Sequence, residues 1–306
     1  MAATLSCDYS GLMALKEKRV GKSIKKLRKI LTKRAKPLSP EDVHDLRTRS
    51  RRIESSIQAT QLSTKRNERA LLRNLRRIRK KAGKVRDMDV LTSHVLNLRV
   101  KGEEDCLTRL AEHLGSQRYK HAEKLRRTIK RYGEKTRRRL KRTRCRFEHE
   151  IEAASANSES LQSAAAISAL QRSSDLASPP VLNRSNLHPY RVKVKELRYV
   201  LQAGDGEGDR KFVASLGETK DAIGEWHDWE ELIAIAQDVL DHQPHCALID
   251  ELKRISRDKY ESALSIANKL RAGYLKPQSK PGRGKQAVYK HETTQPALKA
   301  VSSITS

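Results

Sequence analysis

The sequence is 306 residues long and has 65 lysines and arginines against 37 acids, which gives a formal net charge of +28. A chain of this length can bury a sizeable core, and a charge of this size favours a polyanion as partner: nucleic acid, polyphosphate or an anionic membrane surface. The four cysteines, Cys7, Cys106, Cys145 and Cys246, form no C-x-x-C pair, so neither a zinc ribbon nor a disulfide scaffold is predicted.

The positive charge is concentrated in the first half of the chain. Residues 1–150 hold 44 lysines and arginines against 17 acids, whereas residues 151–306 hold 21 against 20.

No apolar run approaches the roughly 20 residues that a membrane helix needs, and the N-terminus lacks the basic start and apolar centre of a signal peptide. We therefore expect a cytoplasmic protein with reduced thiols and no membrane span.

The first predicted helix runs from about residue 10 to 36, where Pro37 ends it. Ser39 and Pro40, followed by two acids, are typical of a helix start. In the helix that follows, apolar residues recur at the spacing of a core-facing side: Val43, Leu46, Ile53 and Ile57, with Ser50 in the gap. One position behind this stripe lie three basic residues that we expect to face a groove: His44, Arg47 and Arg51.

The next predicted helix covers residues 66–82 and carries four basic residues outside its apolar side: Arg73, Arg76, Arg77 and Lys80. Gly83 is predicted to interrupt this helix before its apolar side continues to about residue 99. After Gly102 we expect a short helix to residue 114, which Gly115 separates from a long helix over residues 117–152. In that helix seven basic residues, the cation row, recur at spacings of three and four: Lys120, Lys124, Arg127, Arg131, Lys135, Arg138 and Arg142.

The cation row is unusual because like charges one helical turn apart repel by a few tenths of a kcal/mol per pair. A solvated helix face would normally interleave acids with the bases. The other side of this helix is apolar, with Ala122, Leu125, Ile129, Tyr132 and Leu140, so the helix can bury one side and keep the row outside. We interpret the row as an anion-binding surface, and the alternative is a solvated face without a ligand.

The pattern of the helix around His44 returns 144 residues later, after a stretch rich in Ser, Ala and Pro. The apolar stripe is here Leu187, Tyr190, Val194, Leu197 and Leu201, and one step behind it lie His188, Arg191, Lys195 and Arg198. Two copies of one arrangement indicate an internal duplication. Further helices are predicted over residues 210–223, 226–241 and 246–272.

Strand signals are almost absent, so we predict an all-α fold of two antiparallel helical bundles. The expected organisation is a strongly basic N-terminal helical half at 8–154, a connection at 155–186, a C-terminal helical half at 187–272, and a flexible basic tail at 273–306.

Two segments, H-D-L-R-x-x-x-R-R from His44 and L-H-P-Y-R-V-K-V-K-E-L-R-Y from Leu187, resemble the signature helices of the CHAD family, the conserved histidine α-helical domain. G-K-V-R-D-M-D-V-L from Gly83 follows the first histidine by 39 residues, and G-E-W-H-D-W-E-E-L from Gly224 follows the second by 36, in the order and spacing of the family. The resemblance implies two bundles related by a pseudo-two-fold axis, with the signature helices lining a basic central groove. It also implies inorganic polyphosphate as ligand and association with polyphosphate granules.

We predict that polyphosphate is bound by the basic residues of both signature helices, of the helix from residue 66 and of the cation row. Cations on successive helical turns are about 5.4 Å apart, and Arg can bind phosphate oxygens through two hydrogen bonds at once. The predicted set is His44, Arg47, Arg51, Arg52, Arg73, Arg76, Arg77, Lys80, Lys124, Arg127, Arg131, Lys135, Arg138, His188, Arg191, Lys195 and Arg198.

We predict no enzyme, cofactor or metal site. His44 or His188 could accept a phosphoryl group, or could have only a packing or capping role, but no Gly-rich phosphate loop or nucleophile-base pair accompanies them. His242, His245 and Cys246 lack an evident fourth metal ligand. Nucleic acid is the main alternative ligand, since basic helices also suit its backbone, although two Phe and two Trp offer few platforms for base stacking.

Overall fold

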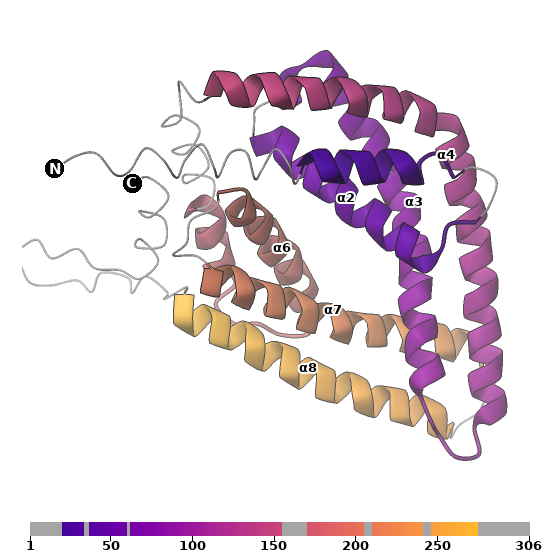
Figure 1. Ribbon diagram of the computed structural model, residues 1–306. Helices are drawn as coiled ribbons and strands as arrows, with labels where there is room; N and C mark the ends of the chain where they lie inside the picture. The colour runs from indigo at the N-terminus through magenta and orange to yellow at the C-terminus, as the bar shows by residue number, and fades with distance from the viewer. Residues whose placement is uncertain are drawn as a thin grey trace, which may run out of the picture. The chain divides into compact units, whose positions relative to one another are not determined.

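The structure is a computed structural model that describes residues 20–33, 37–59, 62–154, 170–204, 210–240 and 246–274. The regular elements in these ranges are all helical (Figure 1). This confirms the predicted all-α class. None of the described helices has the length and apolar character needed to cross a bilayer. Residues 10–19 of the first predicted helix, residues 155–169 of the connection and the tail from residue 275 lie outside the described residues. After a helix over residues 20–30 the elements are α2 (Pro40–Ala59), the short 3-10 helix η1 (Leu62–Thr64), α3 (Arg66–Asn97), α4 (Glu104–Ala154), α6 (Leu187–Gly204), α7 (Arg210–Val239) and α8 (Ala247–Tyr274).

The described residues form two compact units, each with its own apolar core. Unit 1 contains residues 20–154 and the described part of Asp228–Lys253, and unit 2 contains residues 170–227 and 254–274. Helices α7 and α8 therefore contribute to both units. The core of unit 1 is built mainly from α2, α3, α4 and the helix at 20–30, and the core of unit 2 from α6 and the neighbouring parts of α7 and α8.

The start of α2 agrees with the sequence prediction. Ser39 caps the helix, since its Oγ accepts a hydrogen bond from the backbone N–H of Asp42 at 3.1 Å. The predicted core-facing stripe of α2 and that of α6 are both buried, and Ser50 and Tyr190 lie among the apolar residues of these stripes. The three-four spacing of apolar residues thus identified the packed side of both helices correctly.

The predicted breaks at Gly83 and Gly115, and between residues 223 and 226, are wrong because α3, α4 and α7 run through them without interruption. A glycine inside a helix costs only about 1 kcal/mol relative to alanine. Packing outweighs that cost: in α4 the side chains of Leu110, Leu114 and Leu125 on both sides of Gly115 are buried in the apolar interior.

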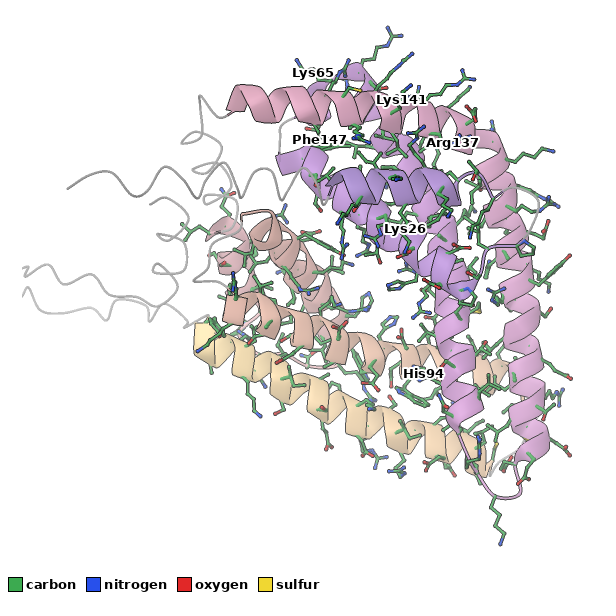
Figure 2. The ribbon with its side chains drawn as sticks, viewed as in Figure 1. Lys26, Lys65, His94, Arg137, Lys141 and Phe147 are labelled. Atoms are coloured by element: carbon green, nitrogen blue, oxygen red, sulfur yellow. The ribbon has the colours of Figure 1, made fainter. Side chains whose placement is uncertain are left out.

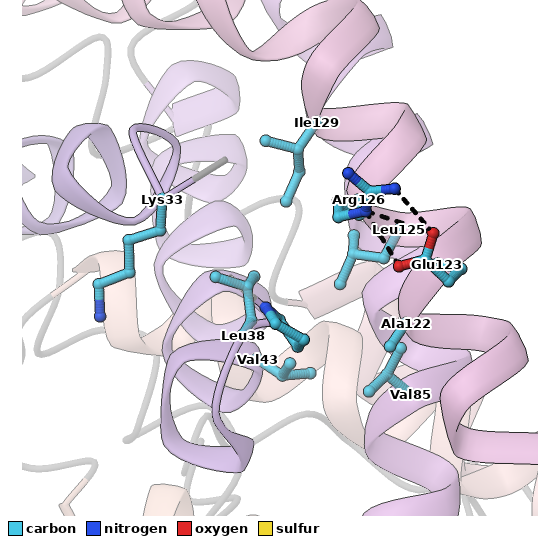
Figure 3. Close-up of a pocket in the computed structure, with 10 residues that line it drawn as sticks. Lys33, Leu38, Val43, Val85, Ala122, Glu123, Leu125, Arg126 and Ile129 are labelled. Atoms are coloured by element: carbon cyan, nitrogen blue, oxygen red, sulfur yellow. Dashed lines mark hydrogen bonds and ion pairs between the residues drawn. The ribbon is translucent and has the colours of Figure 1, made fainter. Parts of the chain in front are cut away.

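Gly133 allows α4 to approach the helix at 20–30 closely. A Cβ atom at this position would lie 3.3 Å from Cγ2 of Ile129 and 3.5 Å from the carbonyl oxygen of Leu31. Below this contact the side chains of Leu38, Val43 and other residues line a hollow that holds no more than a water molecule (Figure 3). This hollow is therefore too small to hold a ligand.

A buried carboxylate ties the start of α3 to the end of α4. The side chain of Glu68 is fully buried and accepts hydrogen bonds from Asn67 Nδ2 at 2.8 Å and Thr143 Oγ1 at 2.9 Å. Arg146 completes the site with an ion pair of 2.5 Å between its Nη1 and Glu68 Oε2. Every hydrogen-bonding partner of this carboxylate comes from the two helices that it joins, so the site fixes their register.

We predict that Glu68→Ala lowers the free energy of unfolding by about 2 to 4 kcal/mol, because hydrogen bonds to a charged group are worth about 1.5 to 3 kcal/mol each and several are lost together. Glu112→Ala, at an exposed position of α4, should change it by less than about 0.5 kcal/mol. Urea denaturation followed by circular dichroism measures both values. Equal stability of the two variants would contradict a structural role for Glu68.

Candidate functional site

In unit 1 the second basic residue of the α2 signature helix, Arg47, is held against α3. Its Nη1 group donates to the carbonyl oxygen of Gly83 at 3.0 Å and to Oδ1 of Asp87 at 3.2 Å. The side chain is 25% exposed. The guanidinium lies over Gly83, where a Cβ atom would make an ordinary contact of 3.4 Å with Arg47 Nη1.

In unit 2 the corresponding residue of α6, Arg191, is held against α7 in a similar way. Its Nε donates to the carbonyl oxygen of Lys220 at 3.1 Å. A Cβ atom at Gly224 would collide with the guanidinium, at 2.8 Å from Cζ and closer still to Nη2. Each signature helix thus places an arginine over the glycine of the second motif in its own half, which is an arrangement that an internal duplication predicts.

Around Arg51 several cations share one carboxylate between α2 and α3. Glu54 pairs with Arg79, whose Nη2 lies 3.0 Å from Glu54 Oε2. Burial raises the pKa of Glu54, while the positive charges of Arg79, Arg51 and Arg76 oppose that rise. Arg79 is absent from the predicted set because it lies on the side of α3 that turns toward α2, which sequence periodicity alone does not identify.

A second group of charges surrounds Asp87, the partner of Arg47. Burial raises the pKa of Glu231 on α7, and the carboxylate of Asp87 raises it further while Lys84 lowers it. Burial lowers the pKa of His121 on α4, and Lys124 and Lys84 lower it further. Lys84 and His121 were missed by the sequence prediction, although Lys84 directly follows Gly83 in the family motif.

The cation row lies on the solvent side of α4, and all seven of its side chains are exposed. The opposite side is buried, with Leu125 and Ile129 2% exposed and Leu140 fully buried. The predicted division of this helix into an apolar side and a basic side is therefore confirmed. Arg131 of the row and Arg77 of α3 both lie over the ring of Tyr132, at 5.3 and 5.1 Å from its centre.

The remaining predicted residues of unit 1 are on its surface. His44 is exposed, and its Nε2 lies 3.5 Å from Oγ1 of Thr48, at the limit of a hydrogen bond. The other four are exposed side chains of α2 and α3: Arg52, Arg73, Arg76 and Lys80.

In unit 2 the signature histidine packs against a second histidine. The rings of His188 and His227 are 4.1 Å apart between their centres and inclined by 35°. Burial lowers the pKa of His188, and His227, Arg191 and Lys195 lower it further, while its Nδ1 is buried without a hydrogen-bonding partner. The sequence prediction missed His227 because its position against His188 depends on how α7 packs on α6.

Arg198, the last predicted residue of α6, is half-buried. Its Nε would lie 3.3 Å from a Cβ atom at Gly217, so this guanidinium also packs against a glycine of α7.

Comparison with known proteins decides the family. A family model described as the CHAD domain matches residues 19–237. The chain belongs to the CHAD domain family. Its fold is similar to a crystal structure of the CHAD domain from the plant Ricinus communis, with a TM-score of 0.57, 17% identity, and coverage of 83% of this chain and 88% of that chain. The comparison with curated proteins returned no match.

The family's signature residues in this CHAD domain thus fall into two sets, one in each unit. In unit 1 the structure brings Arg47, Arg51 and Arg76 to the α2–α3 side, and in unit 2 it brings His188, Arg191 and Lys195 to one side of α6. That both sets line one groove stays a prediction. The described residues contain no group of three His, Cys, Asp or Glu able to hold a metal ion, and His242 and His245 lie outside them.

Because nearby cations lower the pKa of His188, we predict that Lys195→Gln raises it. The fold favours neutral His188, so this residue contributes stability above its ordinary pKa of about 6.5 that is lost as the pH falls through its lowered value. NMR titration of the ring protons measures the pKa. Lys269→Gln, at an exposed position of α8, should leave it unchanged, and equal shifts in both variants would contradict a local effect.

Proposed function

We propose that this CHAD domain binds inorganic polyphosphate without catalysis, through the basic residues of the two signature helices and their neighbours. The observation that carries the proposal is the gathering of cations at these residues. The charges of Arg51, Arg76 and Arg79 all act on the carboxylate of Glu54. In unit 2 the charges of His227, Arg191 and Lys195 all act on His188.

Phosphate groups would neutralise this concentration of positive charge. A guanidinium held in place by backbone carbonyls, as Arg47 and Arg191 are, loses little conformational freedom when it binds an anion. Negative phosphates beside His188 would favour its protonated form, which donates hydrogen bonds from both ring nitrogens. The site therefore gains hydrogen bonds as well as charge neutralisation from the ligand.

A polymer of phosphate alone suits this surface better than nucleic acid does. Sequence-independent binding of single-stranded nucleic acids relies on aromatic side chains on which bases stack. Among the large apolar residues that the structure describes as exposed, Tyr119 is the one aromatic. The family's known ligand, polyphosphate, requires no stacking, and we propose polyphosphate granules in the cytoplasm as the place where the protein acts.

The alternative of a phosphohydrolase or phosphotransferase using His44 or His188 has little support in the geometry. A nucleophilic histidine is normally oriented by a second group that fixes its tautomer. His44 has Thr48 at 3.5 Å, and Nδ1 of His188 has no hydrogen-bonding partner. We therefore propose a binding module, and the first experiment below tests that choice.

We predict that the protein binds long-chain polyphosphate and leaves its chain length unchanged. The protein is incubated with end-labelled polymer and a divalent metal ion, and bound and free polymer are separated by gel electrophoresis. Retarded polymer of unchanged length is expected. Release of orthophosphate at enzymatic rates would overturn the proposal of a binding module, and unretarded polymer would overturn polyphosphate binding.

Replacing the signature cations Arg47, Arg51, Arg191 and Lys195 with alanine should weaken polyphosphate binding by well over tenfold, because each lost charged contact is worth about 1.5 to 3 kcal/mol. The matched control replaces four exposed cations outside the signature helices and should bind nearly as well as wild type: Lys25, Lys101, Arg257 and Lys269. Calorimetry measures both affinities, and circular dichroism checks that the helices persist. Equal losses would show that net charge alone governs binding.

A second variant tests the same site without removing a charge. Gly224→Ala adds one methyl group that displaces the guanidinium of Arg191, whereas Gly83→Ala makes an ordinary contact with Arg47. Alanine inside a helix is more stable than glycine by about 0.5 to 1 kcal/mol, so unfolding would not explain a loss. We expect Gly224→Ala to weaken polyphosphate binding several-fold and Gly83→Ala to leave it unchanged; the reverse order would contradict a role for Arg191.

A further inference from the structure

The outer side of α4 is a strongly basic surface with little internal neutralisation. Between residues 120 and 144 the sequence has thirteen lysines and arginines and two acids. Both acids already have partners: Glu123 binds Arg126, and Glu134 binds Arg137 and Arg138. Besides the cation row, Lys130 and Lys141 are also exposed, so a broad band of the helix surface is positive.

This surface is long and continuous. From Lys120 to Arg142 the cation row extends about 33 Å at a rise of 1.5 Å per residue. Figure 1 shows α4 bending along its length at the edge of unit 1, and Figure 2 shows side chains with terminal nitrogen atoms projecting from its outer edge. The helix exposes its basic side because its apolar side packs into the core through Leu125, Ile129 and Leu140.

Within unit 1 the cation row and the signature residues lie on different helices. Arg47 reaches from α2 to Gly83 and Asp87 of α3, and Arg51 lies beside Glu54 between the same two helices. The row instead lies opposite the buried residues Leu125 and Ile129, which face the core that α2 also faces. Helix α3 lies between the two basic surfaces, since it contacts α2 through Arg79 and α4 through Arg77.

We infer that the outer side of α4 is a second polyphosphate-binding surface, so that one molecule binds two polyphosphate segments at once and bridges them. This inference rests on the proposed function, because it assigns the same ligand to a second place. The evenly spaced cations can neutralise successive phosphates of an extended chain without base recognition. Two surfaces on one molecule turn a binder into a cross-linker of long polymers.

The test counts oligophosphates bound per protein molecule. A short linear oligophosphate, which cannot span both surfaces, is titrated into the full chain in a calorimeter. The wild type should bind two oligophosphates. The α4 variant, with Lys120, Arg127, Lys135 and Arg142 all changed to glutamine, should bind one, with the signature-site affinity unchanged. The same change at Lys25, Lys101, Arg257 and Lys269 removes equal charge and should leave two sites.

Light scattering with long-chain polyphosphate gives an independent result. Wild type and control should form large assemblies, whereas the α4 variant should form small complexes that scatter little.

One oligophosphate per wild-type molecule, or equal losses in the α4 and control variants, would overturn the inference while leaving polyphosphate binding intact. An α4 variant that keeps two oligophosphates but loses binding of duplex RNA would also overturn it, in favour of a nucleic-acid surface. A wild type that binds no oligophosphate would refute the proposed function itself.

Discussion

Repulsion between cations opposes the packing of the helices of unit 1, because the first 150 residues carry far more bases than acids. The apolar cores supply the attraction, and a few carboxylates relieve the repulsion where helices meet: Glu54 between α2 and α3, Asp87 beside Arg47, and Glu68 between α3 and α4. These carboxylates lie where helices meet, whereas the outer side of α4 has only two acids among thirteen bases between residues 120 and 144. The same distribution of charge therefore places acids where helices meet and leaves the outer surface of α4 strongly basic.

The packed sides of the helices could be predicted from the sequence because a helix repeats every 3.6 residues, so spacing alone selects a side. The stripes of α2 and α6 and the cation row of α4 follow this rule. Helix continuity through Gly83 and Gly224 could not be predicted, because each glycine lies under an arginine from another helix, and at Gly224 that arginine leaves no room for a side chain. Local propensity indicates a break at such a position, and only the packed structure reveals the contact.

For the candidate site, too, the sequence predicts on which side of its own helix a residue lies, but not which residues of other helices lie beside it. Residues that follow an apolar stripe by one step were placed correctly beside the packed side, as Arg47 and Arg191 show. His227, Arg79 and His121 were missed because each gains its place from a partner helix, through a stacked ring, a shared carboxylate or nearby lysines. These partners depend on which sides of two helices meet, and no pattern within one segment contains that information.

The uninterrupted course of α4 restricts how this chain can change in length. One residue inserted between Gly115 and Lys120 would rotate everything beyond it by about 100° about the helix axis. The cation row would then turn toward the core, and Leu125 and Ile129 toward water. Insertions or deletions of about seven residues, close to two full turns, would preserve the orientation. Helix α4 should therefore tolerate substitution on its outer side far better than any single-residue change in its length.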